Sequence, residues 1–274
     1  MNRTSSCAGA AHGLHRSWQN DRLYPEALSA NRRVEALENE IMNRLKRAAA
    51  SLRRDGAVAR DVTIPCGPLD LQGHLGLPRG ADGVVLFAHG IGSSRHSPRN
   101  KLVAHALEQQ GLGTLLFDLL TEDEAQDRAN VFNISLLAER LLAATDWIAQ
   151  ETNTARLQVG YFGASTGAAA ALIAEPLADS PIFAVVSRGG RPDLTMASLP
   201  RVKSPTLLIV GGRDMEVLDL NRQALAVLQT EKDLKIVPGA THLFEEPGAL
   251  AKVSDLAAAW FMQHLHSQSA RAVG

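Results

Sequence analysis

Gly-Tyr-Phe-Gly-Ala-Ser-Thr-Gly occupies residues 160–167 and joins an apolar strand to a run of small residues with helical character, 166–174. The GxSxG pattern inside it is typical of a tight strand-to-helix turn, which holds the central Ser165 in strained backbone angles with its hydroxyl above a sheet. Gly163 and Gly167 stand where a side chain would collide as the helix crosses back over its strand. Because the pattern also arises by chance, its meaning depends on the rest of the chain.

The length and charge of the chain limit its class. Its 274 residues suit one large α/β domain with a terminal extension, and 28 basic against 29 acidic residues give a net charge of −1. This balance predicts no nucleic-acid partner, and the strand-length apolar runs predict no membrane span. Cys7 and Cys66 lack CxxC spacing and the first 25 residues lack an apolar core, so we expect a cytoplasmic protein.

The amino-terminal part differs in pattern from the rest. Residues 31–54 repeat apolar side chains every three or four positions, which predicts one amphipathic helix, whereas residues 1–30 are expected to be disordered. We therefore expect an extension at 1–55, a main domain carrying the site at 56–266 and a flexible tail at 267–274. The apolar stripe of the helix should pack on the main domain, and the alternative is a homodimer contact.

From residue 57 onward, short apolar runs alternate with helical patterns. Alternation over 57–64 and 69–77 predicts an antiparallel strand pair. Further strands are expected at 83–88, 113–118, 157–162, 182–188, 205–211 and 233–237. Helices are expected at 97–110, 133–150, 166–177, 217–229 and 248–264. Continuous apolar strands separated by helices predict an α/β fold, a mostly parallel, doubly wound sheet of about eight strands with helices on both faces.

Polar residues follow three of these strands, at the edge where open parallel sheets bind ligands. They are Ser165, Asp214 and His242, in that chain order. A serine hydroxyl needs an imidazole to take its proton, and a carboxylate fixes the tautomer of that imidazole and stabilises its charged form. We therefore predict Ser165 as nucleophile, His242 as base and Asp214 as orienting acid.

Two of these residues have structural alternatives. Ser165 could simply cap the helix that follows it, as serine commonly does. Asp214 could pair with Arg213 or cap the helix from Glu216, in which case Glu216 or Asp219 would serve as the acid.

A tetrahedral oxyanion needs two hydrogen-bond donors beside the nucleophile. The backbone N–H of Thr166 follows the nucleophile at a helix start, where the helix dipole favours negative charge. The second donor should come from the glycine-rich segment 89–92. We assign it to the N–H of Ile91, with Gly92 as the alternative, and expect His89 to brace this loop.

Together these motifs resemble the α/β-hydrolase fold. The matching segments are Phe-Ala-His-Gly at 87–90, Gly-Ala-Ser-Thr-Gly at 163–167, Gly-Gly-Arg-Asp at 211–214 and Gly-Ala-Thr-His at 239–242. The resemblance covers about 57–265. Within that superfamily the chain is most similar to small proteins of the dienelactone hydrolase type, because the short segment 189–204 leaves no room for a lid domain.

The resemblance includes one difference. Dienelactone hydrolases proper use a cysteine nucleophile, whereas this turn carries Ser165. The segment 92–100, Gly-Ser-Ser-Arg-His-Ser-Pro-Arg-Asn, is also similar to hydrolase domains that are joined to phosphoribosyltransferases. These likenesses imply a compact esterase and name no substrate.

Arginines near the expected site suggest the charge of the substrate. Arg95 lies in the loop of the second oxyanion donor, and Arg188 and Arg191 follow the strand at 182–188. Guanidinium groups bind carboxylates and phosphates through paired hydrogen bonds, so we predict an anionic small-molecule substrate bound by Arg188, Arg95 and Arg191. The alternative is structural pairing with acids of the segment 118–124.

The predicted activity is that of a serine hydrolase acting on a small ester, thioester or lactone through an acyl-enzyme. No metal site is expected, because the histidines are scattered without ligand spacing, and no nucleotide cofactor is expected, because glycine-rich phosphate motifs are missing. The alternatives are an amidase or peptidase of the same fold, and a catalytically silent scaffold that binds or dimerises.

Overall fold

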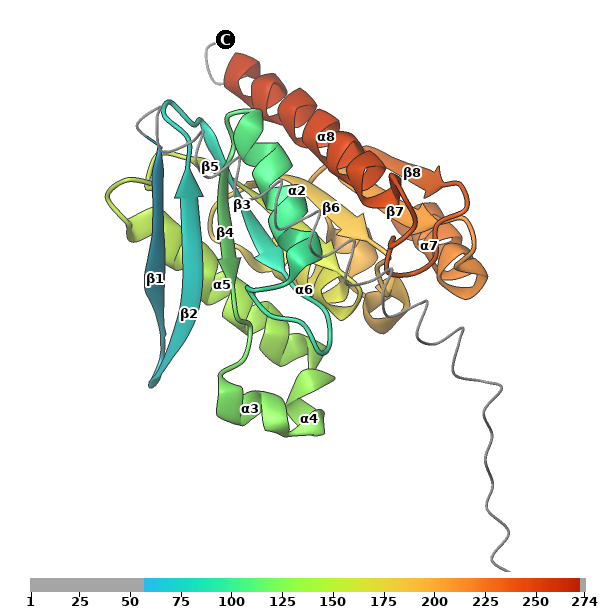
Figure 1. Cartoon of the computed structure of the whole chain (residues 1–274), viewed down its shortest axis with the longest axis horizontal. Helices are drawn as coiled ribbons and strands as arrows, with labels where there is room; N and C mark the ends of the chain where they lie inside the picture. The colour runs from blue at the N-terminus through green and yellow to red at the C-terminus, as the bar shows by residue number, and fades with distance from the viewer. Residues whose placement is uncertain (1–56, 272–274) are drawn as a thin grey trace, which may run out of the picture.

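The computed structural model describes residues 57–271, which form an eight-stranded sheet with helices on both faces (Figure 1). The strand order across the sheet is β1-β2-β4-β3-β5-β6-β7-β8. The strands are β1 (Val58–Cys66), β2 (Leu69–Leu77), β3 (Gly83–Ala88), β4 (Gly113–Phe117), β5 (Gln158–Ala164), β6 (Ile182–Arg188), β7 (Thr206–Gly211) and β8 (Lys232–Val237). The expected mostly parallel α/β sheet is confirmed.

One strand, β2, runs opposite to the other seven strands of the sheet. β1 pairs with β2, and β2 with β4, in antiparallel register, whereas every pair from β4 to β8 is parallel. β3 lies between β4 and β5, so the connection that leaves β3 leads to one side, to β4, and the connection that leaves β5 leads to the other side, to β6. Where two neighbouring parallel strands are followed by connections to opposite sides, a crevice forms at their carboxyl ends, here those of β3 and β5.

The helices form two layers. The elements are α2 (Pro98–Gln109), α3 (Glu122–Gln126), α4 (Arg128–Val131), α5 (Ile134–Gln150), α6 (Thr166–Ala174), α7 (Met215–Val227), α8 (Ala249–Arg271) and the 3-10 turns η1 (Glu175–Leu177), η2 (Pro192–Thr195) and η3 (Leu199–Arg201). Buried residues of α2 and α8 pack on one face of the sheet, and those of α5 and α6 pack on the other. The short α3 and α4 lie beyond the end of β4 (Figure 1).

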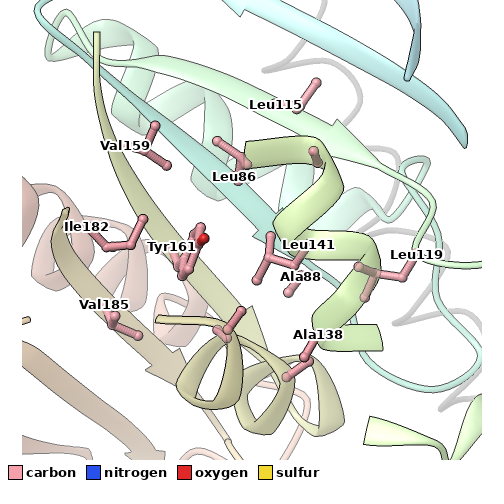
Figure 2. Packing of buried hydrophobic residues seen from close by; sticks show 14 of the residues in the cluster. Leu86, Ala88, Leu115, Leu119, Ala138, Leu141, Val159, Tyr161, Ile182 and Val185 are labelled. Carbon is pink, nitrogen blue, oxygen red and sulfur yellow. The ribbon is translucent and has the colours of Figure 1, made fainter. Parts of the chain in front are cut away.

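The core between α5 and the sheet shows how one face of these strands is buried (Figure 2). Tyr161 of β5 is fully buried and lies among Leu141 and Ala138 of α5 and neighbouring strand residues. Its hydroxyl is 2.7 Å from Oγ1 of Thr145, so the one polar atom of this large side chain has a partner. The apolar strand residues pack against α5 and α6 on this face and against α2 and α8 on the other. Because the strands from β4 to β8 are parallel, their carboxyl ends lie at one edge of the sheet.

Several element boundaries differ from those expected. The helix expected at 166–177 ends at Ala174 and continues as η1, where Pro176 cannot donate a helical hydrogen bond. The acidic segment after β4 forms α3, because Thr121 and Glu124 make a reciprocal capping box. α8 continues through Arg271, so helix occupies the first part of the tail expected at 267–274.

The amino-terminal predictions lie outside the described residues. The extension at 1–55, its helix at 31–54 and the homodimer contact stay predictions. Over 57–271, no helix combines the length and apolar character that crossing a membrane requires.

Candidate active site

Ser165 has the backbone conformation that the GxSxG pattern predicts. Its φ is 52° and its ψ is −119°, and among the non-glycine residues described only Phe244 shares a positive φ. Such angles are strained for a residue with a side chain and persist where the surroundings impose them. Ser165 directly precedes α6, yet its side chain makes no capping hydrogen bond to that helix. The hydroxyl is therefore not engaged by the helix that follows it.

Three glycines let the backbone approach closely around this turn. A Cβ on Gly163 would lie 2.4 Å from the Cα of Ala168, and a Cβ on Gly167 would lie 2.1 Å from the carbonyl oxygen of Ala88. A Cβ on Gly90 would lie 2.9 Å from the Cβ of Ser165. Since real Cβ contacts are longer than this, only glycine fits, and the loop after β3 is held directly against the serine.

Asp214 and His242 meet at the ends of β7 and β8. Nδ1 of His242 lies 2.6 Å from Oδ2 of Asp214, and the Asp214 side chain is 15% exposed against 38% for His242. Asp214 precedes α7 but makes no capping bond to it, so its carboxylate faces the imidazole instead. The Arg213 N–H donates to the carbonyl of Ala240 at 2.9 Å, which ties the two loops together.

The segment that follows β6 contacts both Ser165 and His242. The Ser165 N–H donates to the carbonyl of Arg188 at 3.2 Å. A Cβ on the next residue, Gly189, would lie 3.4 Å from Cε1 of His242. The hydrogen bonds within 57–271 do not include one between the Ser165 hydroxyl and His242, and such bonds often form only when substrate binds. Ser165 and His242 therefore both lie against residues 188–189.

His89 organises the loop after β3. The Leu119 N–H donates to Nε2 of His89 at 3.1 Å, so Nε2 is unprotonated and Nδ1 carries the proton of the neutral ring. Nδ1 then donates to the carbonyl of Gly90 at 3.0 Å, and that carbonyl also accepts from the Ser93 N–H at 3.2 Å. In a trans peptide the N–H of Ile91 points opposite to this carbonyl. Burial lowers the pKa of His89, which favours this neutral form.

A cavity of about 270 Å³ lies beside this loop. Its wall includes Gly90 and Ile91 on one side and Thr121, Val131 and Leu137 of the α3–α5 region on the other. Sequence reasoning missed the second group, since nothing in the spacing of these residues marked them as neighbours of the loop. Ser165 and His242 are not part of the wall, so the cavity adjoins the candidate site without containing it.

The three arginines expected near the site have different surroundings. Arg95 forms an ion pair with Asp118, whose Oδ1 also accepts from the Arg95 N–H at 2.7 Å. Arg191 binds Asp193 through two bonds of 2.8 Å and 2.7 Å. Arg188 is 8% exposed, and its Nε and Nη1 are buried without a partner. The charges of Arg95 and Arg191 are therefore balanced locally, and that of Arg188 is not.

A serine on a strained turn after β5, an acid after β7 and a histidine after β8, on a sheet of this strand order, define an α/β-hydrolase. A model of the dienelactone hydrolase family matches residues 71–265, and the chain belongs to that family.

Solved structures and a curated protein are also similar to this chain. A dienelactone hydrolase from Anabaena variabilis is 54% identical, with a TM-score of 0.74 over 76% of this chain and 98% of that one. Est1E from Butyrivibrio proteoclasticus, 15% identical with a TM-score of 0.65 over 75% and 99% of the two chains, shares the fold. A Mycobacterium tuberculosis protein whose name suggests a phosphoribosyl transferase is 52% identical over 237 residues, 83% of this chain. The chain spans only 54% of that protein's length.

Proposed function

We propose that this protein is a cofactor-independent serine hydrolase that cleaves a small ester, thioester or lactone through an acyl-enzyme on Ser165. The observation that carries the proposal is the strained Ser165, approached by Gly90 on one side and by the segment beside the Asp214–His242 pair on the other. Membership of the dienelactone hydrolase family supports a hydrolase in general.

The Asp214–His242 contact supports specific roles for both residues. With Nδ1 of His242 directed at Asp214, the other ring nitrogen, Nε2, is the one available to take the proton of Ser165 Oγ. The oxygen then attacks the carbonyl carbon, and His242 returns the proton to the leaving alcohol, thiol or lactone oxygen. Water, deprotonated by the same nitrogen, releases the acyl group. Asp214 stabilises the imidazolium without itself being protonated.

Two backbone donors complete the proposed site. Thr166 contributes the N–H of the first residue of α6, where the helix dipole adds to the stabilisation of an oxyanion. Ile91 contributes the second N–H, because the Gly90 carbonyl is held by His89 and Ser93 and the Ile91 N–H therefore faces away from them. Gly92 remains the alternative donor within the same loop.

Serine in place of cysteine bears on the substrate. Dienelactone hydrolases proper use a cysteine nucleophile, whereas this chain carries Ser165, so we do not expect dienelactone itself to be the natural substrate. The phosphoribosyl transferase name belongs to a longer protein, of which this chain spans 54%, and is not transferred to this chain.

A fluorophosphonate probe tests the proposal with the full-length protein. Labelling of the wild type that is lost in Ser165→Ala, and kept in a control variant at the exposed Ser180, is the expected result. Hydrolysis of short neutral nitrophenyl esters should follow the same pattern. Folded wild-type protein that takes up no label would instead support the silent scaffold, and faster cleavage of matched anilides than of esters would support an amidase.

A further inference from the structure

Arg188 is the last residue of β6 and carries a buried charge without a counter-charge. Its side chain is more than nine-tenths buried, and neither Nε nor Nη1 has a hydrogen-bond partner. Burial, together with the nearby cation Arg99, lowers the pKa of Arg188 to about 10, so the guanidinium is still charged at neutral pH. The neighbouring charge that affects the Arg188 guanidinium is therefore that of Arg99, which is also positive.

The surroundings of Arg188 also favour an anion. Arg99 stands in the first turn of α2, a helix of 12 residues with no acidic residue in that turn. The positive end of a helix dipole thus adds to the two guanidinium groups. Nε of Arg99 is a further buried hydrogen-bond donor without a partner. Glu245 balances part of this charge, since Arg99 donates to its Oε1 at 3.0 Å.

Several other arginines of the described residues have a carboxylate partner, unlike Arg188. Arg60, Arg95, Arg140 and Arg191 each pair with a carboxylate. Removing a guanidinium from water without compensation is costly, and a buried charge is ordinarily paired. Since no carboxylate of the described residues compensates Arg188, the missing counter-ion has to come from outside them.

We propose that Arg188, supported by Arg99 and the first turn of α2, binds an oxyanion group, a carboxylate or a phosphate, that is carried by the substrate. The site adjoins the reacting groups, because the carbonyl of Arg188 accepts from the Ser165 N–H and the next residue, Gly189, lies against His242. The inference rests on the proposed hydrolase activity for the role of the anion in catalysis. Binding of an anion can be measured independently of that activity.

Matched esters test the catalytic part. Mono-nitrophenyl succinate and nitrophenyl butyrate differ mainly in the terminal carboxylate, and we expect Arg188→Met to lower kcat/KM for the first by roughly ten- to hundredfold while changing the second by less than about twofold. Arg222→Met, which removes an exposed guanidinium on α7, should leave both rates unchanged. Equal losses for the two esters, or no loss for either, would overturn the proposal.

Thermal shift tests the binding part. Succinate or inorganic phosphate, at constant ionic strength, should raise the Tm of the wild type and of Arg222→Met but not that of Arg188→Met. Arg188→Met should fold, since it replaces an unpaired buried charge by an apolar chain of similar length. If it does not fold, Arg188→Lys serves, with a smaller Tm rise expected because lysine cannot form the paired bonds. Equal shifts in wild type and variant would reject the anion site. Loss of the shift in a protein that the fluorophosphonate never labels would instead keep the anion site and reject the hydrolase.

Discussion

Nδ1 of His242 lies 2.6 Å from Oδ2 of Asp214, although the two residues are 28 positions apart and follow different strands. Because β7 and β8 are parallel neighbours, their carboxyl ends meet at one edge, and the loops that follow them are bonded to each other through Arg213 and Ala240. A short contact between a carboxylate and an imidazole fixes which ring nitrogen is left for chemistry.

Replacing Asp214 with Asn should therefore lower kcat by about three to four orders of magnitude, since the amide no longer selects the productive tautomer or stabilises the imidazolium. The measurement is the rate of nitrophenyl ester hydrolysis. Asp219→Asn, on the exposed face of α7, is the control and should be close to wild type. Retained activity in Asp214→Asn, with activity lost in Glu216→Gln, would move the role of the acid to Glu216.

His89→Ala should lower kcat by roughly ten- to hundredfold with little change in KM, because the Gly90 carbonyl loses one of its two donors and the Ile91 N–H is less well aimed. The fluorophosphonate labelling rate should fall in parallel. His74→Ala removes an exposed histidine, paired with Asp61, and controls for loss of an imidazole. A rise in KM at constant kcat would show that His89 serves substrate binding instead.

The stability of the protein should decrease as the pH falls below about 6.5, in part because of His89. Burial lowers the pKa of this residue in the folded protein, so the unfolded chain binds its proton first as the solution becomes acidic. The loss begins at the unfolded value of about 6.5 and continues down to the folded value. Tm measured from pH 7.5 to 5.5 should decline less steeply in His89→Ala than in the wild type. Parallel curves would contradict the assignment.

Gly167→Ala should be strongly destabilising, since its Cβ would lie 2.1 Å from the Ala88 carbonyl oxygen and force β3 and α6 apart. Gly80 offers a comparison, because it has a φ of 72° but open space around its Cβ position. Gly80→Ala should cost only the ~1–2 kcal/mol of a left-handed residue, whereas the cost of Gly167→Ala should exceed that. Denaturant unfolding of the two variants measures the difference, and similar costs would mean that the turn at 163–167 is looser than described.

Much of the fold could be predicted because its signals are local. The apolar runs of β3 to β7 and the three-to-four spacing of α5 are visible within a few residues, and the glycines around Ser165 indicate a close approach that no other residue permits. Two features were less visible. α3 and α4 depend on caps at Thr121 and Asp127 within an acidic segment that has no apolar periodicity. The cavity beside the loop after β3 depends on α3 to α5 folding back toward it.

The sequence alone determined the order of strands and helices, the strained turn at Ser165 and the placement of Asp214 and His242 after later strands, because each depends on neighbours in the chain. Only the tertiary structure decided that Asp214 faces His242 rather than capping α7, and that Arg95 and Arg191 are paired while Arg188 is not. The physical reason is that the partner of a charged side chain depends on how the secondary-structure elements pack, and local sequence does not record this. For Arg188 the packing supplied burial without a carboxylate.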